Sequence, residues 1–247
     1  MLKIAHITDT HIAPVGEKPK GIDSLQRFLD VLEQISRGDF DILIHTGDIS
    51  YPEGSRESYQ WMKEQLDGLD IPYYLRPGNH DDVLLMQEVF KLKDLPPREV
   101  LNGVIAARGQ SLMFLDSSSE RLSVKQASWL AREIEVQEDD LFLFMHHPPC
   151  SCGVKVMDSK YPYKTSAYFQ KIAADSGRSL TLFTGHYHIE KTVTPENTDL
   201  TVHISPPTFG SLDPDSEDYS ISDERGGWRE IVINKQKLIT TDCRYLD

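Results

Sequence analysis

Short apolar runs that end at polar turns recur along the chain, and each run is typical of a β-strand. Each one is rich in β-branched or aromatic residues and stops where Asp, Gly, Asn or His residues begin. The runs lie at residues 3–8, 41–46, 71–75, 112–115, 141–145, 180–184 and 201–204. The pattern predicts a series of buried strands whose ends carry polar side chains.

Between these runs, apolar residues recur at the spacing of an amphipathic helix. Residues 22–36 show this clearly, because Leu25, Phe28, Leu32 and Ile35 fall on one helical face. Further helical stretches cover residues 56–66, 84–90, 124–135 and 165–174. The alternation of strands with helices predicts an α/β fold in which helices cover buried sheets.

The pattern changes after about residue 190, where the helical stretches stop. Strand candidates at 192–194, 201–204, 228–233 and 238–242 predict a β-rich C-terminal portion, residues 190–247. Residues 211–223, which we call the acidic segment, are rich in Asp, Ser and Pro and predict a mobile surface loop. No repeat or long linker interrupts the sequence, so we expect a single domain over residues 1–247.

Composition narrows the classes of partner and compartment. The chain has 39 acidic and 26 basic residues, so its net charge is −13, and this charge disfavours binding of long nucleic acid. A small anion could still bind where metal ions supply local positive charge. Cys150 and Cys152 are too close in sequence for an ordinary disulfide and predict thiols in a reducing compartment. With no leader-like start and no run of 18 apolar residues, we expect a cytoplasmic protein without membrane contact.

Five clusters of candidate metal ligands follow five of the predicted strands. They contain Asp9 and His11; Asp48; Asn79, His80 and Asp81; His146 and His147; and His186 and His188. Since ligand sites in α/β folds form beyond the carboxyl ends of strands, we expect these clusters to converge. Carboxylates, imidazoles and an amide without thiolates suit Mn, Fe or Zn in a reactive site better than a structural zinc site.

In chain order these blocks read Asp9-Thr10-His11, Gly47-Asp48, Gly78-Asn79-His80-Asp81, His146 and Gly185-His186-Tyr187-His188. This order resembles the signature DxH, GD, GNH with D or E, H, and GHxH of the calcineurin-like metallophosphoesterase superfamily. The resemblance implies a four-layer α-β-β-α sandwich of two mixed sheets flanked by helices. The β-rich portion would complete the second sheet.

The resemblance also implies a centre of two divalent ions (Mn, Fe or Zn) that share a bridging hydroxide as nucleophile. Seven side chains would bind them: Asp9, His11, Asp48, Asn79, His146, His186 and His188. Asp9, His11 and His188 would hold one ion, and Asp48 would bridge to a second ion held by the other three.

The catalytic residues implied by the resemblance are His80 and Asp81. His80 would stabilise the transition state or protonate the leaving alkoxide, and Asp81 would orient its ring. Contacts with substrate would come from Asn79, His80, His147 and His188. His147 follows the predicted ligand of its block and is expected at the rim of the site.

Two absences guide the choice within the superfamily. Residues 47–52 lack the GDxxDRG extension of the protein Ser/Thr phosphatases, and an acidic single domain lacks the basic groove of the repair nucleases. What remains is similar to class III cyclic-nucleotide phosphodiesterases and small glycerophosphodiesterases. This resemblance implies an enzyme that hydrolyses a small phosphodiester such as a 3′,5′-cyclic nucleotide, and it is consistent with a homodimer.

Three alternatives stay open at this stage. The chain could be a glycerophosphodiesterase, a broad phosphomonoesterase or diesterase, or a non-catalytic metal-binding scaffold.

Among the other residues, His6 and His45 lie inside apolar strands and are expected to be hydrogen-bonded core residues. Tyr161 and Tyr163 could stack on a nucleobase or simply pack at the surface.

Overall fold

The computed structural model describes residues 1–92, 101–137, 140–235 and 237–247. Within these ranges the strands form a five-stranded sheet, a six-stranded sheet and a two-stranded ribbon. The five-stranded sheet has the order β13-β12-β1-β2-β3. Its members are β1 (Leu2–Ile7), β2 (Ile42–His45), β3 (Tyr73–Leu75), β12 (Gly227–Asn234) and β13 (Lys237–Tyr245).

The six-stranded sheet has the order β4-β5-β6-β7-β9-β8, with a parallel centre and antiparallel edges at β4 and β8. Its members are β4 (Gly103–Ala107), β5 (Gln110–Phe114), β6 (Leu141–Phe144), β7 (Leu180–Thr184), β8 (Lys191–Val193) and β9 (Leu200–Ile204). The ribbon pairs β10 (Ser211–Leu212) with β11 (Ile221–Asp223). Both large sheets are therefore mixed.

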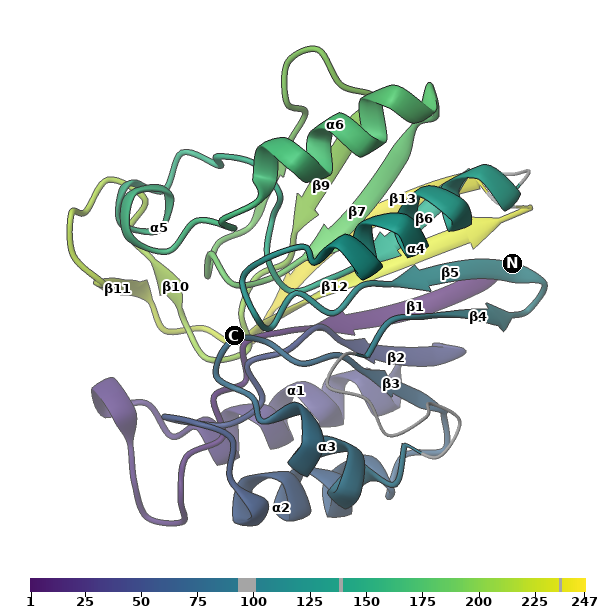
Figure 1. Cartoon of the computed structure of the whole chain (residues 1–247). Coiled ribbons are helices and arrows are strands. Elements are labelled where there is room, and N and C mark those ends of the chain that lie inside the picture. Colours follow the sequence, from purple (N-terminus) through teal and green to yellow (C-terminus); the bar gives the residue numbers. More distant parts are fainter. Residues whose placement is uncertain (93–100, 138–139, 236) are drawn as a thin grey trace.

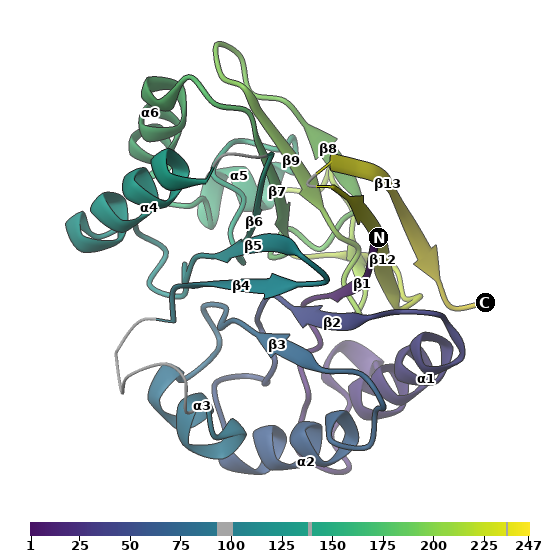
Figure 2. The ribbon, with the colours of Figure 1, turned by 90° about the vertical axis from the view of Figure 1, so that its right-hand side faces the viewer.

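Helices cover the outer face of each large sheet (Figures 1 and 2). The helices are α1 (Ser24–Arg37), α2 (Arg56–Leu66), α3 (Val83–Phe90), α4 (Val124–Val136), α5 (Lys155–Lys160) and α6 (Ser166–Ser176), with a 3₁₀ turn at Pro19–Gly21. The first three pack on the five-stranded sheet, and α4 to α6 contribute to the core over the other sheet. Together these layers confirm the predicted α-β-β-α sandwich.

The alternation of side chains along each strand explains the three apolar cores. On β6, Leu141 and Leu143 face the helices, whereas Phe142 and Phe144 point into the layer between the two sheets. Because successive side chains on a strand point to opposite faces, a strand covered on both sides must be apolar throughout. This explains the continuous apolar runs in the sequence.

The predicted elements end within three residues of the observed ones, but the C-terminal portion is arranged differently from the expectation. Only β8 and β9 join the six-stranded sheet; β12 pairs with β1, and β13 pairs with β12. Ile231 and Ile233 on β12 pack between the sheets beside Leu2 and Ile4. The prediction that residues 190–247 complete the second sheet is therefore corrected, and the single domain stays a prediction.

In the part of the chain that the structure describes, no helix has the length and apolarity needed to span a membrane.

Candidate metal centre

Loops that follow β1, β2, β6 and β7 meet through main-chain hydrogen bonds. The Asp9 N–H donates to the Gly47 carbonyl at 2.9 Å, and the Gly185 N–H donates to the His146 carbonyl at 3.0 Å. The His186 N–H donates to the Asp9 carboxylate at 3.0 Å, which links the two sheets. The predicted convergence of the strand ends is thus present in the backbone.

Glycines before three of the ligand positions allow this close approach. A Cβ at Gly78 would overlap the Asp48 side chain, and one at Gly185 would overlap Asp9. Gly47 has a φ of +113°, and a Cβ there would overlap the backbone of Gly78. Glycine is required at these positions because any larger residue would push the ligand loops apart.

Many of the predicted ligands have a backbone conformation that is unusual for residues other than glycine. Positive φ angles occur at Asp9, His11, Asp48, His186 and His188. Such conformations cost on the order of 1–3 kcal/mol each and cluster at functional sites, where the surrounding structure enforces them. Their concentration here indicates that the loops are shaped for binding rather than for stability.

Asp9, His11 and His188 form the first cluster. His188 Nε2 lies 3.4 Å from Asp9 Oδ1 and 3.1 Å from His11 Nε2. His188 Nδ1 donates to the Gly210 carbonyl at 3.0 Å, so the neutral ring keeps an unprotonated Nε2 that faces the cluster. Two imidazoles and a carboxylate converging in this way suit a divalent cation.

His146 and His186 form the second cluster, and each is oriented by a main-chain carbonyl. His146 Nδ1 donates to the Thr46 carbonyl at 3.1 Å, whereas His186 Nε2 donates to the Tyr161 carbonyl at 2.9 Å. When one nitrogen of a neutral imidazole is fixed as the donor, the other nitrogen keeps a lone pair that can bind a metal ion. The two imidazole centroids are 5.0 Å apart.

Asp48 lies between the clusters. Its Oδ2 is 3.2 Å from His146 Nε2 and 3.8 Å from His11 Nε2, and its Oδ1 accepts from the His80 main-chain N–H at 3.0 Å. In the metal-free protein, burial opposes protonation of His146, but Asp48 outweighs it and raises the pKa of His146 to about 9. The Asp48 carboxylate therefore favours a positive charge beside it.

Orphaned polar atoms provide a test of whether the residues fit a cation. Asn79 Oδ1 is buried without a hydrogen-bond partner, and His146 Nε2 is buried with no neighbour to satisfy it other than the Asp48 carboxylate at 3.2 Å. Leaving a buried acceptor unsatisfied costs about 1–3 kcal/mol, so such atoms in a functional site point to a missing partner. Both atoms are good metal donors, and the donor set therefore fits divalent ions.

His6 and His45 have the supporting role expected from the sequence. His45 accepts from the Gly47 N–H at 3.0 Å and contacts Thr10 Oγ1 at 3.0 Å, and burial lowers the pKa of His45 to about 3. His6 contacts Thr46 Oγ1 at 2.9 Å. Both imidazoles form hydrogen bonds with the ligand-bearing loops but lie outside the two clusters.

His80 faces the cavity above the centre, as expected for a residue that contacts substrate. Its Nδ1 donates to the Pro52 carbonyl at 2.5 Å. This bond leaves Nε2 as the nitrogen available for proton transfer.

Asp81 does not orient the ring of His80. Its carboxylate accepts from the N–H groups of Gly78 at 2.9 Å and Ile49 at 3.1 Å and from the Tyr59 hydroxyl at 3.0 Å. Burial, followed by the nearby Asp48, raises the pKa of Asp81 to about 6. The prediction of a catalytic, ring-orienting Asp81 is corrected, because its acceptors are used to join the loops after β2 and β3.

We therefore expect Asp81→Ala to lower the free energy of unfolding by about 2–4 kcal/mol, because several buried donors lose their acceptor at about 1–3 kcal/mol each. Urea titration of the chelator-treated protein measures this. Asp82→Ala is the matched control: among the described residues the Asp82 carboxylate accepts from the Leu85 N–H alone, as the N-cap of α3, and its loss should cost about 1 kcal/mol. Equal losses in the two variants would contradict the loop-joining role.

His147 is fully buried, with 0% exposure, and does not line the cavity. Its Nδ1 lies 3.0 Å from Ser117 Oγ, and its ring centroid lies 4.2 Å from that of His186 and 5.7 Å from that of Tyr163. The expectation of a rim residue that contacts substrate is corrected. His147 lies buried beside His146 and His186, in one group of side chains that could hold a cation, and Ser117 contacts its Nδ1.

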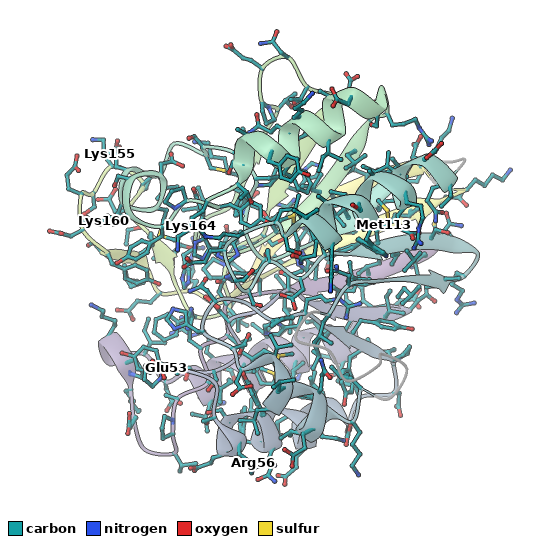
Figure 3. The ribbon with its side chains drawn as sticks, viewed as in Figure 1. Glu53, Arg56, Met113, Lys155, Lys160 and Lys164 are labelled. Carbon is teal, nitrogen blue, oxygen red and sulfur yellow. The ribbon has the colours of Figure 1, made fainter. Side chains whose placement is uncertain are left out.

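The acidic segment differs most from its prediction as a solvated loop. It packs beside α5, where Lys155 pairs with Asp215 and Lys160 with Asp218 (Figures 1 and 3). This docking brings the Tyr219 hydroxyl to 3.2 Å from His188 Nε2. Tyr219 is not among the site residues that the sequence predicts, because a single aromatic residue within an acidic stretch is its only local signal.

A cavity of about 340 Å³ opens onto these residues. Its polar floor is formed by His11, Asp48, Asn79, His80, His186 and His188. Its walls are mainly apolar or aromatic, with Lys20 as the one cation among the described lining residues: Lys20, Tyr51, Met157, Tyr161, Phe209 and Tyr219. The candidate centre is therefore accessible to a small ligand with both a polar and an apolar part.

Comparison with solved structures supports the fold. The chain is similar to a dimetal phosphatase from Danio rerio, with a TM-score of 0.66 and 13% identity over 95% of this chain and 93% of that chain. At this identity the likeness shows the shared fold alone. It agrees with the two mixed sheets and flanking helices described above.

Sequence comparison gives closer relatives. A Fibrobacter succinogenes protein named "Probable cyclic nucleotide phosphodiesterase" is 35% identical over 235 residues, 94% of this chain and 89% of the relative. An Arcobacter nitrofigilis protein named "Probable glycerophosphodiester phosphodiesterase GpdQ" is 28% identical over 195 residues, 75% of this chain and 71% of the relative. The calcineurin-like phosphoesterase family matches residues 2–190. The chain belongs to this family and is a metal-dependent phosphoesterase.

Proposed function

We propose that this protein hydrolyses a 3′,5′-cyclic nucleotide with two divalent ions. The observation that carries the proposal is the position of Asp48, whose carboxylate lies between His11 and His146 at the floor of the cavity. A carboxylate has two oxygens and can serve two cations at once. Mn, Fe and Zn all accept this set of ligands.

The ligand set has two halves. Asp9, His11 and His188 would hold one ion; Asn79, His146 and His186 would hold the other. Asp48 would serve both. When bound, the pair supplies neutralising charge for the phosphoryl oxygens and lowers the pKa of a water that attacks phosphorus.

The protein's own contribution is to orient the diester and to handle the leaving group. Asn79 and His80 line the cavity next to Asp48, where the phosphoryl group would lie. With Nδ1 bonded to the Pro52 carbonyl, His80 can carry a proton on Nε2 and pass it to the departing alkoxide. Cleavage of a cyclic diester then yields a nucleoside monophosphate.

The choice of substrate rests on the relatives and on the cavity walls. The Fibrobacter relative is named for cyclic nucleotides and aligns with 94% of this chain, whereas the relative named for glycerophosphodiesters aligns with 75%. Aromatic walls also suit a nucleoside better than glycerol, whose hydroxyl groups would lack partners there.

A substrate panel tests the proposal. Chelator-treated protein is reloaded with Mn²⁺ and assayed on 3′,5′-cyclic nucleotides, glycerophosphodiesters and phosphomonoesters, with kcat/KM as the measure of preference. We expect the highest kcat/KM on a 3′,5′-cyclic nucleotide. A higher value on a glycerophosphodiester would overturn the proposal in favour of that activity.

A further inference from the structure

Tyr161 is an aromatic residue at the cavity that no step of the proposed reaction uses. Its side chain is 47% exposed, whereas the neighbouring Tyr163 is 2% exposed and packs against His147. The sequence left both tyrosines open as stacking residues, and only Tyr161 lines the cavity. An exposed ring beside a buried polar centre is available for a ligand.

The position of Tyr161 relative to the metal centre is fixed by its main chain. Its carbonyl accepts from His186 Nε2 at 2.9 Å, and its N–H donates to the Met157 carbonyl at the end of α5 at 2.9 Å. Both bonds involve backbone atoms, so they persist when the side chain is changed. The ring is thus held close to a predicted metal ligand without contributing to the cluster.

Two further apolar side chains extend this wall. Met157 lies on α5, 3% exposed, and lines the same cavity. Tyr219 is positioned by the acidic segment, which contacts α5 through the two lysine pairs and through the Lys155 N–H, which donates to the Pro214 carbonyl at 2.9 Å. Residues from two separate segments therefore line the same cavity beside His186 and His188.

We infer that Tyr161, with Met157 and Tyr219, forms the subsite that binds the nucleobase of the substrate. The inference rests on the proposed function and adds the residues that would select a nucleotide over other diesters. A base offers a flat π-face to an aromatic side chain, and such stacking contributes about 1–3 kcal/mol per base. The phosphoryl group would lie on the cavity floor and the base against this wall.

The test measures binding separately from turnover. Mn²⁺-loaded protein is titrated with adenosine 5′-monophosphate, ribose 5-phosphate and inorganic phosphate by calorimetry. Tyr161→Ala is expected to weaken binding of adenosine 5′-monophosphate by about 5- to 150-fold, the range that 1–3 kcal/mol of stacking implies. The affinities for ribose 5-phosphate and phosphate are expected to stay unchanged.

Two variants serve as controls. Tyr161→Phe keeps the ring and is expected to bind adenosine 5′-monophosphate like the parent protein. Tyr168→Ala removes a tyrosine of similar exposure, 43%, that lies on α6 and does not line the cavity. It is expected to leave all three affinities unchanged, which separates loss of the subsite from a general effect of removing a surface ring.

The inference is overturned if Tyr161→Ala weakens the binding of all three ligands equally, because that result would indicate a damaged metal centre. It is equally overturned if the substitution weakens the binding of none of them. It is also overturned if the parent protein binds ribose 5-phosphate as tightly as adenosine 5′-monophosphate. The proposed function is tested by a different measurement: it fails if the parent protein has its highest kcat/KM on a glycerophosphodiester in the substrate panel. The two failures are therefore distinguishable.

Discussion

Replacing Asp48 with alanine is expected to abolish stable metal binding in both halves of the site. Asp48 Oδ2 is the atom that lies near both His146 Nε2, at 3.2 Å, and His11 Nε2, at 3.8 Å. Loss of a supporting residue alone costs about 10- to 100-fold in metal affinity or activity, so loss of a shared ligand should exceed that. Elemental analysis after Mn²⁺ loading and desalting measures the metal content directly.

The Asp48→Asn variant separates the ligand role from a role in folding. Asparagine keeps the shape and the carbonyl oxygen that can accept from the His80 N–H, a bond of 3.0 Å in the parent protein. It lacks the charge and the second oxygen that a shared ligand needs. We expect native-like thermal unfolding of this variant in chelator, together with loss of paired metal. Two ions per chain in Asp48→Ala would rule out the bridging role.

The clustering of the candidate metal ligands could be predicted from the sequence because their signals are local. Asp9, Asp48 and His186 each follow an apolar strand within a short block, and ligand sites in α/β folds form beyond the carboxyl ends of strands, here the ends of β1 and β2 in one sheet and of β7 in the other. The glycines before Asp48 and His186 are part of the same local signal, since they allow the loops to touch.

Other features could not be predicted because they depend on contacts between distant segments. Tyr219 lies beside His188 because the acidic segment is held by contacts with distant residues, among them the Leu212 N–H, which donates to the His188 carbonyl, and the pairs with Lys155 and Lys160 on α5. Composition alone indicates a solvated loop. His147 has the same residue type as its neighbour His146, and its burial depends on contacts with Ser117, Tyr163 and His186, which are distant in the sequence.

Asp81 and the C-terminal strands likewise depend on contacts between distant segments. The sequence places Asp81 next to His80 but does not reveal that its oxygens accept from Ile49 and Tyr59. Strand periodicity likewise predicts that residues 228–233 form a strand without indicating which sheet it joins. Pairing with β1 is decided by Ile231 and Ile233, which fill the layer between the sheets.

Replacing His80 with alanine is expected to retain both metal ions and to lower turnover of a cyclic nucleotide by about 10²- to 10⁴-fold, the usual contribution of a positioned acid or base. Asp48 is contacted by the main-chain N–H of His80, which the substitution preserves. His80→Gln is the control, because glutamine can still donate to the Pro52 carbonyl but has no titratable nitrogen. It should lose as much activity as the alanine variant.

The leaving group distinguishes proton transfer from simple binding. An alkoxide leaves poorly without a proton, whereas 4-nitrophenolate is a stable anion and needs none. His80→Ala should therefore retain far more activity on bis(4-nitrophenyl) phosphate than on a cyclic nucleotide. Equal losses on both substrates would mean that His80 acts by holding the phosphoryl group instead, because only protonation of the leaving group depends on the basicity of the departing oxygen.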